Sequence, residues 1–311
     1  MAGPVCLVVN PAARNGRARH SLPAVLDVLA PADTELRVRE SSSLEHAAGI
    51  AAGAAGRGET VVAVGGDGLV GALAAALARA EGRLGIIPAG RGNDFARMLG
   101  IPAGPAAAAR LLLASAPRPV DLIGVRADDG PEQVVAGSVY LGIVAEGGEL
   151  LNRSRLARGR AAYRLAGLRA LLAWEPARFT VDPVPAADGS LEFGGFCVVA
   201  ANSGYLAAGT PAAPDADVTD GLLDIITVHD GPRRSFVRVM QRAAKGTHLG
   251  LRQVGAERAA SVTVLADRPM RAGADGETLA CAAPLAAGTP LRIRALPAAL
   301  NVIRPAGRVP A

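Results

Sequence analysis

Aromatic residues, lysine and cysteine are all scarce in this chain of 311 residues. Only 3% of the residues are aromatic, so the hydrophobic cores must be packed mainly from leucine, valine and alanine. Lys245 is the only lysine, and arginine supplies the rest of the positive charge. The three cysteines, Cys6, Cys197 and Cys281, show no CxxC spacing, and two of them lie in apolar runs. This pattern predicts reduced core thiols and argues against a disulfide framework or a cysteine-based metal site.

Long apolar runs and basic tails are also missing. No segment approaches the roughly 20 uninterrupted apolar residues that a membrane-spanning helix needs, and the first residues do not resemble a signal peptide. We therefore expect a cytoplasmic protein whose membrane contact, if there is any, is peripheral and at the inner membrane face. A net charge of +5 favours anionic partners only as a non-specific field. Basic residues are not interleaved with stacking aromatics, which argues against a nucleic-acid partner.

The segment Thr60–Leu77 reads as a buried strand, a glycine turn and a helix. The strand is a run of small and β-branched apolar residues, typical of a parallel strand that is covered on both faces. The Gly65-Gly66-Asp67-Gly68 turn leads into a helix rich in leucine and alanine. Glycines and a helix N-terminus together suit a phosphate group, and an aspartate in such a loop suggests an accompanying divalent cation. On local sequence alone, a tight turn capped by Asp67 is an equally good interpretation.

The same pattern recurs on both sides of this segment. The apolar run Val5–Val9 ends at Asn10, and Leu84–Pro88 runs into a second glycine loop that carries Asn93 and Asp94. Helical segments alternate with these strands, which predicts parallel strands with right-handed crossovers. Ligands bind at the carboxyl ends of strands in such sheets. We therefore expect an α/β domain with two ligand-facing glycine loops.

After Pro117-Arg118-Pro119 the pattern changes to short, partly alternating strands separated by turn residues, which predicts an antiparallel β domain. The predicted strands are 133–143, 178–181, 191–200, 221–228, 260–265 and 291–294. One exception is the arginine-rich stretch 147–174, which has helical character. A surface helix with one core-facing stripe is the favoured interpretation, and a helix resting on anionic lipid stays open.

Two later loops carry carboxylates. Three aspartates lie within six residues at Asp215, Asp217 and Asp220, close enough for one loop to fold around a hard cation, although an Asp-rich turn explains the spacing as well. Glu277 directly follows an Asp-Gly turn. A carboxylate held at a turn can serve as a general base, while an exposed hairpin position is the alternative.

Taken in order, five motifs resemble the catalytic domain of the diacylglycerol kinase family, which includes bacterial soluble lipid kinases and is related to sphingosine kinase and NAD kinase. They are Asn10-Pro11, Gly65-Gly66-Asp67-Gly68, the 88–97 loop, Asp220-Gly221-Leu222-Leu223-Asp224 and Asp275-Gly276-Glu277. The resemblance implies an NAD kinase-like α/β domain with a parallel sheet (residues 1–120, with about 292–311 returning to it). It also implies a β-sandwich-like acceptor domain (residues 121–291) and a nucleotide in the cleft between the two.

The resemblance further implies a role for each motif. Glu277 would be the base that takes the proton from the lipid hydroxyl, and Asp67 and Asp94 would organise the catalytic Mg²⁺. ATP would be bound by Asn10, Ser41, Gly65, Gly66, Asp67, Gly68, Leu69, Val70, Gly71, Arg91 and Asn93. A second, structural Mg²⁺ would be held by Asp217, Asp220 and Leu222.

Two positions depart from the family pattern, because Leu69 and Arg91 stand where many relatives have threonine. Leu69 removes a hydroxyl from the loop, and Arg91 offers a guanidinium that can bind a triphosphate. The leading hypothesis is an ATP- and Mg²⁺-dependent kinase for diacylglycerol or a similar lipid. A kinase for another alcohol (a sphingoid base, a polyprenol or a soluble metabolite), a non-catalytic nucleotide-binding regulator and a homodimeric assembly all stay open.

Overall fold

The computed structural model describes residues 3–11, 17–32, 34–153, 160–184, 189–279 and 284–307. Its first part is a parallel sheet in the order β2-β1-β3-β4, formed by β1 (Val5–Val9), β2 (Leu36–Glu40), β3 (Thr60–Gly65) and β4 (Arg83–Pro88). Every residue of β1 and β3 is buried, which explains why these strands read as continuous apolar runs. The predicted parallel α/β architecture is confirmed.

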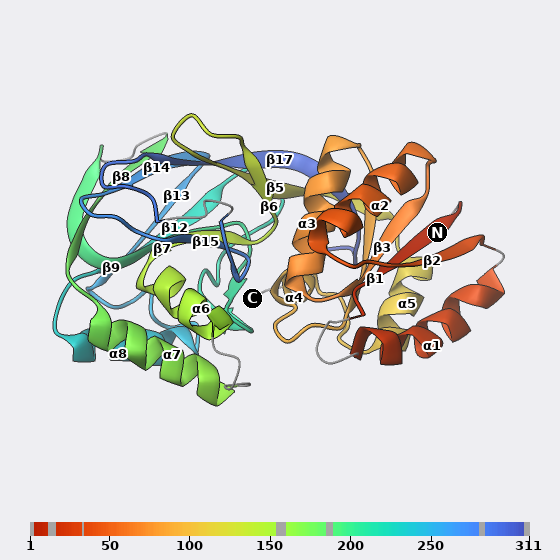
Figure 1. The fold of residues 1–311 in the computed structure, drawn as a ribbon, viewed down its shortest axis with the longest axis horizontal. Helices are drawn as coiled ribbons and strands as arrows, with labels where there is room; N and C mark the ends of the chain where they lie inside the picture. The colour runs from red at the N-terminus through yellow and green to blue at the C-terminus, as the bar shows by residue number, and fades with distance from the viewer. Residues whose placement is uncertain are drawn as a thin grey trace.

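Helices cover both faces of this sheet (Figure 1). On one side α2 (Leu44–Gly56) packs against α3 (Asp67–Arg79), and on the other α1 (Arg17–Leu29), followed by the 3₁₀ turn Ala30–Ala32, packs against α5 (Pro105–Ala114). The short helix α4 (Asp94–Met98) follows the second glycine loop. The helices α3 and α4 therefore begin at the carboxyl ends of β3 and β4.

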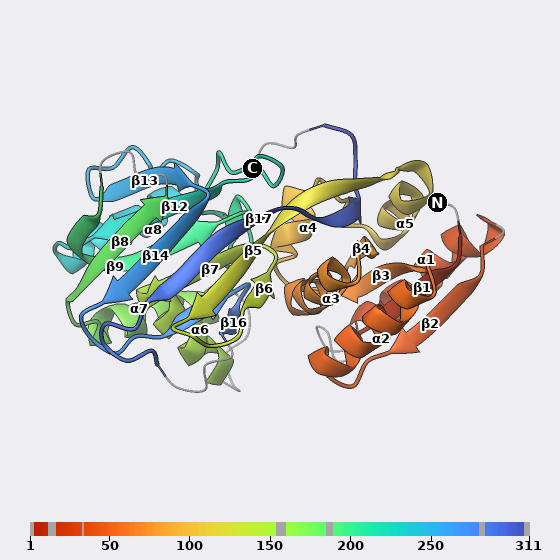
Figure 2. The same cartoon turned by 90° about the horizontal axis from the view of Figure 1, so that it is seen from above.

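The second part is an antiparallel β domain, as predicted, with most of its strands visible from above in Figure 2. Its strands are β5 (Pro117–Ala127), β6 (Gln133–Val135), β7 (Ser138–Gly142), β8 (Ala177–Val184), β9 (Leu191–Ala201), β10 (Tyr205–Leu206), β11 (Thr210–Pro211), β12 (Leu223–His229), β13 (Val254–Ala259), β14 (Ser261–Ala266), β15 (Ala272–Ala274), β16 (Glu277–Thr278) and β17 (Leu291–Ile303).

Among its described residues this domain has three helices, α6 (Ile143–Arg153), α7 (Arg160–Ala173) and α8 (Arg233–Ala243). The expectation of a single strand over 133–143 is wrong, since β6 and β7 divide it and α6 begins at Ile143. The stretch 147–174 holds parts of two helices, with residues 154–159 outside the described ranges. Helix α8 was not predicted, although Phe236, Val239 and Ala243 recur at helical spacing and are all buried.

The strand β17 belongs to the sheets of both parts. Its residues Leu291–Arg294 pair with β14, and Asn301 and Val302 pair in parallel with Arg83 and Leu84 of β4. Along almost its whole length it also pairs with β5, with a register shift between Leu296 and Leu300. The two sheets are thus continuous through β17 (Figure 2). The domain boundary expected near residue 120 falls inside β5.

Candidate functional site

The two glycine loops lie against each other at the carboxyl edge of the parallel sheet. Gly66 precedes α3, and a Cβ atom built on Gly90 would lie 2.3 Å from the Cα of Gly66. A Cβ on Gly66 would lie 2.9 Å from the Cα of Gly90. Such distances exclude any side chain at either position, so the approach of the two backbones requires both glycines.

Asp67 joins the first loop to the second. It is the first residue of α3, and its carboxylate accepts hydrogen bonds from the backbone N–H groups of Asn93 (2.7 Å) and Phe95 (3.4 Å). Burial raises the pKa of Asp67, although these hydrogen bonds oppose the shift. The side chain therefore clamps the two loops together while it keeps a desolvated negative charge at the N-termini of α3 and α4.

Asp94 brings a second, partly buried carboxylate to the same place. Its Oδ2 accepts a hydrogen bond from Ala208 N (3.0 Å), while its buried Oδ1 has no hydrogen-bond partner among the described residues. Burial, and next the charge of Asp67, raise the pKa of Asp94 to about 6. A Cβ on Gly92 would lie 2.9 Å from Asp67 Oδ2 and 3.2 Å from Asp94 Oδ1, so both carboxylates border this glycine.

This pair fits a hard divalent cation. Two neighbouring carboxylates in a desolvated position repel each other, and an unpartnered carboxylate oxygen is the kind of ligand that Mg²⁺ prefers. Within the described ranges no group of three or more His, Cys, Asp or Glu side chains gathers around a point. Asp67 and Asp94 could supply two protein ligands to a cation that takes its remaining ligands from water and phosphate.

The contact to Asp94 comes from the second domain and was not predicted. Ala207, Ala208 and Gly209 connect β10 to β11, with φ angles of 52°, 66° and 91°. This hairpin rests on α4, where Arg97 stacks over the Tyr205 ring at 5.4 Å. The sequence offers only Gly209 as a hint of the turn, because alanine rarely takes positive φ.

The other expected nucleotide residues lie along the same sheet edge. Asn10 and Ser41 follow β1 and β2, and both the N–H and the Oγ of Ser41 donate to the carbonyl of Val9 (2.9 and 3.3 Å). Arg91 is exposed on the second loop. Asn93, with φ of 52°, accepts a hydrogen bond from Gly90 N (2.8 Å) and donates one to Gly90 O (3.2 Å), so its amide shapes the loop.

Leu69 and Val70 take part in the core. Their side chains are 2% and 3% exposed, and Leu69 packs so closely under Gly65 that a Cβ there would lie 2.7 Å from its Cδ2. Gly68 and Gly71 belong to the same first turns of α3. In this part of the helix the backbone, rather than side chains, is available to a phosphate.

Glu277 lies in β16, opposite Ala274 of β15, and its side chain is outside what the structure describes. The turn before it is fixed by Asp275, whose carboxylate accepts hydrogen bonds from the N–H groups of Ala136, Gly137 and Ser138, each at 2.9 Å. Burial raises the pKa of Asp275 to about 6.

Asp275 also faces the first domain. A Cβ on Gly71 of α3 would lie 3.5 Å from Asp275 Oδ2, and Gly276 N donates to the Tyr140 hydroxyl (3.1 Å). The hairpin that carries Glu277 is therefore held against the helix that begins with Asp67. The sequence indicates Asp275 only as part of the turn, because its hydrogen bonds reach residues that are far away in the chain.

In the 215–222 loop, unlike at Asp67 and Asp94, the carboxylates are hydrogen-bonded to residues of their own loop. Asp217 accepts hydrogen bonds from the N–H (3.0 Å) and hydroxyl (2.6 Å) of Thr219, and Asp220 accepts one from Leu222 N (2.9 Å). Asp220 also forms an ion pair with Arg258, which lies 3.7 Å from Asp224. An arginine thus supplies positive charge beside this loop. The assignment of Asp217, Asp220 and Leu222 to a structural Mg²⁺ stays a prediction.

Asp121 anchors this loop and was not singled out from the sequence. It is buried, and its carboxylate accepts hydrogen bonds from Gly221 N and Ala298 N, both at 2.7 Å. Ala298, with φ of 50°, lies at the register shift in β17. One carboxylate therefore ties the 215–222 loop to the strand that the two sheets share.

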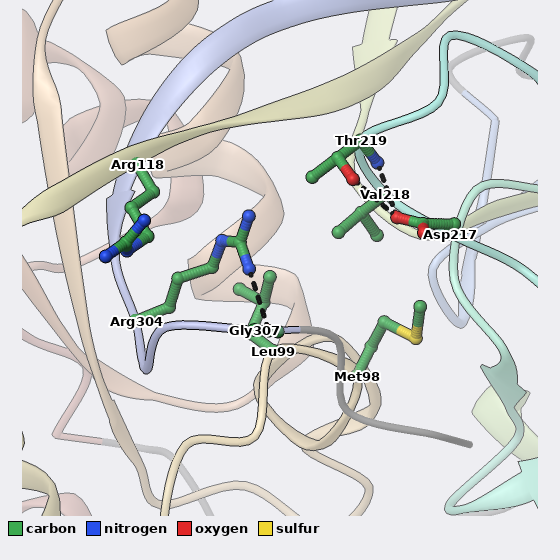
Figure 3. Close-up of a pocket in the computed structure, with 8 residues that line it drawn as sticks. All are labelled: Met98, Leu99, Arg118, Asp217, Val218, Thr219, Arg304 and Gly307. Atoms are coloured by element: carbon green, nitrogen blue, oxygen red, sulfur yellow. Dashed lines mark hydrogen bonds between the residues drawn. The ribbon is translucent and has the colours of Figure 1, made fainter.

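A cavity of about 240 Å³ lies beside this loop, and Figure 3 shows its lining residues. Arg304 extends into the region between Arg118 and Asp217. Burial, and next the charge of Arg118, lower the pKa of Arg304, whereas Asp217 raises it. The cavity is lined by Met98, Leu99, Arg118, Asp217, Val218, Thr219, Arg304 and Gly307.

Two family models match the chain: the diacylglycerol kinase catalytic domain over residues 4–125, and the YegS C-terminal NAD kinase beta sandwich-like domain over residues 137–304. A diacylglycerol kinase of Mycobacterium tuberculosis is 34% identical over 82% of this chain and 80% of its own length. A protein of Xanthomonas euvesicatoria named "Probable lipid kinase YegS-like" is 32% identical over 70% and 72%.

The fold is similar as well. A crystal structure of a diacylglycerol kinase from Bacillus anthracis superimposes with a TM-score of 0.72, covering 98% of each chain at 23% identity. Within the described residues, no helix is long and apolar enough to cross a membrane.

Proposed function

Because the chain belongs to the diacylglycerol kinase family of lipid kinases, we propose that it transfers the γ-phosphate of ATP to a hydroxyl of diacylglycerol or a similar lipid. The observation that carries the proposal is the carboxylate pair Asp67 and Asp94, held by two glycine loops at the end of a parallel sheet. Phosphoryl transfer needs this combination of backbone donors for phosphate and acidic side chains for a cation.

In this proposal the ATP phosphates lie over Gly65–Gly71, next to the start of α3, and Arg91 adds a charge from the second loop. Mg²⁺ held by Asp67 and Asp94 would neutralise the charge of the phosphates. Residues 1–120, with about 292–311, form the nucleotide domain and residues 121–291 the acceptor domain. The pairing of Asn301 and Val302 with β4 supports the assignment of the last segment to the nucleotide domain.

Glu277 is proposed as the base that takes the proton from the lipid hydroxyl. Its support is its place directly after a turn that Asp275 fixes near α3, so the base and Asp67 approach from opposite domains. Closure of the two domains would then bring acceptor and phosphate together.

The test is transfer of labelled γ-phosphate from ATP to diacylglycerol in mixed micelles with Mg²⁺. We expect product from the wild type and a loss of about a hundredfold or more for Glu277→Gln. Glu257→Gln is the matched control, because Glu257 is exposed on β13. Unchanged turnover in Glu277→Gln would contradict the role of this base.

Absence of product from the wild type would contradict diacylglycerol as the acceptor. The same assay with a sphingoid base, a polyprenol and a soluble alcohol then separates a kinase of different specificity from a protein that binds ATP without transfer. ATP binding with no transfer to any of these acceptors would contradict a kinase function altogether.

A further inference from the structure

The cavity beside the 215–222 loop brings two arginines together (Figure 3). Arg118 lies near the start of β5 and is paired with Val302 of β17, two residues before Arg304. The two guanidinium groups therefore come from neighbouring positions at the ends of paired strands. Asp217 is the one carboxylate among the lining residues, so the lining keeps an excess of positive charge.

Arg304 lies in this cavity without adequate hydrogen-bond acceptors. Its Nε is buried and has no hydrogen-bond partner among the described residues, and its Nη1 donates to the carbonyl of Gly307 only at 3.5 Å. Burial, and next the charge of Arg118, lower the pKa of Arg304, so its positive charge is held in an unfavourable place. A buried charged donor that stays unpaired makes the folded protein less stable unless a ligand supplies the acceptor.

The carboxylate in the lining does not supply this acceptor. Among the described residues, no ion pair joins Asp217 to Arg118 or Arg304, and its Oδ1 accepts hydrogen bonds from the N–H and the hydroxyl of Thr219 (3.0 and 2.6 Å). The two arginines form no ion pair with any other described residue either. A negatively charged ligand between them would replace their mutual repulsion by attraction to a shared partner.

The size of the cavity and the kind of donor favour phosphate over a smaller anion. The volume of about 240 Å³ is several times the roughly 30 Å³ of a water molecule, so it holds a tetrahedral oxyanion with a short substituent. Guanidinium groups present forked donors that match the oxygens of phosphate, and these charge-assisted hydrogen bonds are among the strong ones.

We propose that this cavity binds a phosphate group between Arg118 and Arg304, as inorganic phosphate or as the phosphomonoester of a small molecule or a lipid headgroup. Bound there, the phosphate stabilises the ends of β5 and β17. The lining includes neither Asp67 nor Asp94 and no residue of the two glycine loops, so the inference does not rest on the proposed function.

The test is calorimetric titration of the full chain with inorganic phosphate, together with thermal unfolding in phosphate and in sodium chloride of the same ionic strength. A chelator is present throughout, so that no divalent cation holds phosphate at Asp67 and Asp94. Phosphate, but not chloride, should raise the unfolding temperature. Arg118→Gln and Arg304→Gln should each weaken phosphate binding by about tenfold or more.

Two variants are controls for the place of binding. Arg110→Gln replaces an exposed arginine of α5 and should bind phosphate as the wild type does. Arg91→Gln reports on the glycine loops. A phosphate response that is lost in Arg91→Gln but kept in Arg118→Gln and Arg304→Gln would overturn the inference. Equal responses of the wild type to phosphate and chloride would overturn it as well.

The same measurements separate ligand binding from a structural role of Arg304. Without phosphate, Arg304→Gln should be at least as stable as the wild type, because it removes a charge that Arg118 repels. A loss of stability that is the same with and without phosphate would assign Arg304 to the architecture and overturn the inference. Arg118 is exposed, so Arg118→Gln keeps the test valid if Arg304→Gln does not fold.

Glycerol 3-phosphate and a short-chain, water-soluble phosphatidate distinguish the sources of the phosphate group. Tighter binding of glycerol 3-phosphate would identify a small phosphomonoester, tighter binding of the phosphatidate a lipid headgroup, and equal binding of all three compounds the phosphate itself. Each of these results supports the site, provided that Arg118→Gln and Arg304→Gln weaken the binding. Phosphate binding by a protein that transfers phosphate to no acceptor would contradict the proposed function alone.

Discussion

Two groups of aspartates in this molecule differ in the hydrogen-bond and charge partners that surround them. Asp67 and Asp94 lie beside each other with raised pKa values, and one buried oxygen of Asp94 lacks a hydrogen-bond partner among the described residues. Asp121 accepts two backbone hydrogen bonds, and Asp220 is paired with Arg258.

The difference distinguishes aspartates that suit a ligand site from aspartates that stabilise the fold. A carboxylate that is desolvated and left with a like charge beside it makes the folded protein less stable, and such strain is expected where a ligand supplies the missing partner. A carboxylate whose hydrogen bonds are met by the chain stabilises a loop and needs nothing further. The first group is therefore the candidate reaction centre, and the second holds the loop and the shared strand in place.

The largest expected effect is on activity. Asp94→Asn keeps the size of the side chain but removes the charge that would hold a cation, so kcat/KM for phosphate transfer should fall by about a hundredfold to a thousandfold. Asp27→Asn, an exposed position on α1, is the matched control and should be unaffected. Steady-state kinetics with varied Mg²⁺ measure both, and full activity of Asp94→Asn would contradict the assignment.

The next effect is on stability in the other group. Asp121→Ala leaves the N–H groups of Gly221 and Ala298 without their acceptor, and we expect the free energy of unfolding to fall by about 2–4 kcal/mol. The fall in kcat of the folded protein should be far smaller than for Asp94→Asn. Urea unfolding, with the exposed Asp129→Ala as control, checks this. A loss below about 0.5 kcal/mol would show that the anchor is dispensable.

A pH effect should distinguish the groups as well. The pKa of Asp94 is about 6 in the folded protein against an ordinary value of 3.8, so the folded state holds this proton more tightly. Stability should therefore fall as pH rises from about 4 to about 6 and then level off. Without Mg²⁺, Asp94→Asn should be more stable than the wild type by roughly 1–3 kcal/mol above pH 6, with no gain near pH 4. Parallel stability profiles of the two proteins would rule this out.

The smallest effect concerns Arg258. Its pair with Asp220 is partly exposed, so Arg258→Gln should cost about 1 kcal/mol or less in the free energy of unfolding. The change removes the guanidinium from beside Asp220 and Asp224, and the stabilisation of the variant by added Mg²⁺ should exceed that of the wild type. Thermal unfolding with Mg²⁺ and with chelator tests this, with Arg110→Gln as control. Equal responses would mean that Arg258 does not compete with a cation at this loop.

Local pattern was enough to predict much of the fold. The buried runs of β1, β3 and β4, the glycine turns after β3 and β4, and the parallel order follow from residue type and spacing. The sequence could not reveal the contact between Ala208 and Asp94, because a hydrogen bond from the backbone across 114 residues leaves no trace in side-chain pattern. The sequence could not reveal the ion pair of Arg258 with Asp220 either, because the two residues are far apart in the chain.

The shared strand β17 has a consequence for how the protein is made. It leaves the ribosome well after β4 and β5, yet β4 gains its pairing with Asn301 and Val302, and β5 its main partner, only from it. The first domain therefore emerges more than 150 residues before its sheet can be completed, which departs from the usual domain-by-domain order of synthesis and folding. Loss of the final strand would leave both domains with an open sheet edge at once. Synthesis of β17, rather than emergence of each domain, therefore sets the earliest moment at which the sheet of the first domain can be completed.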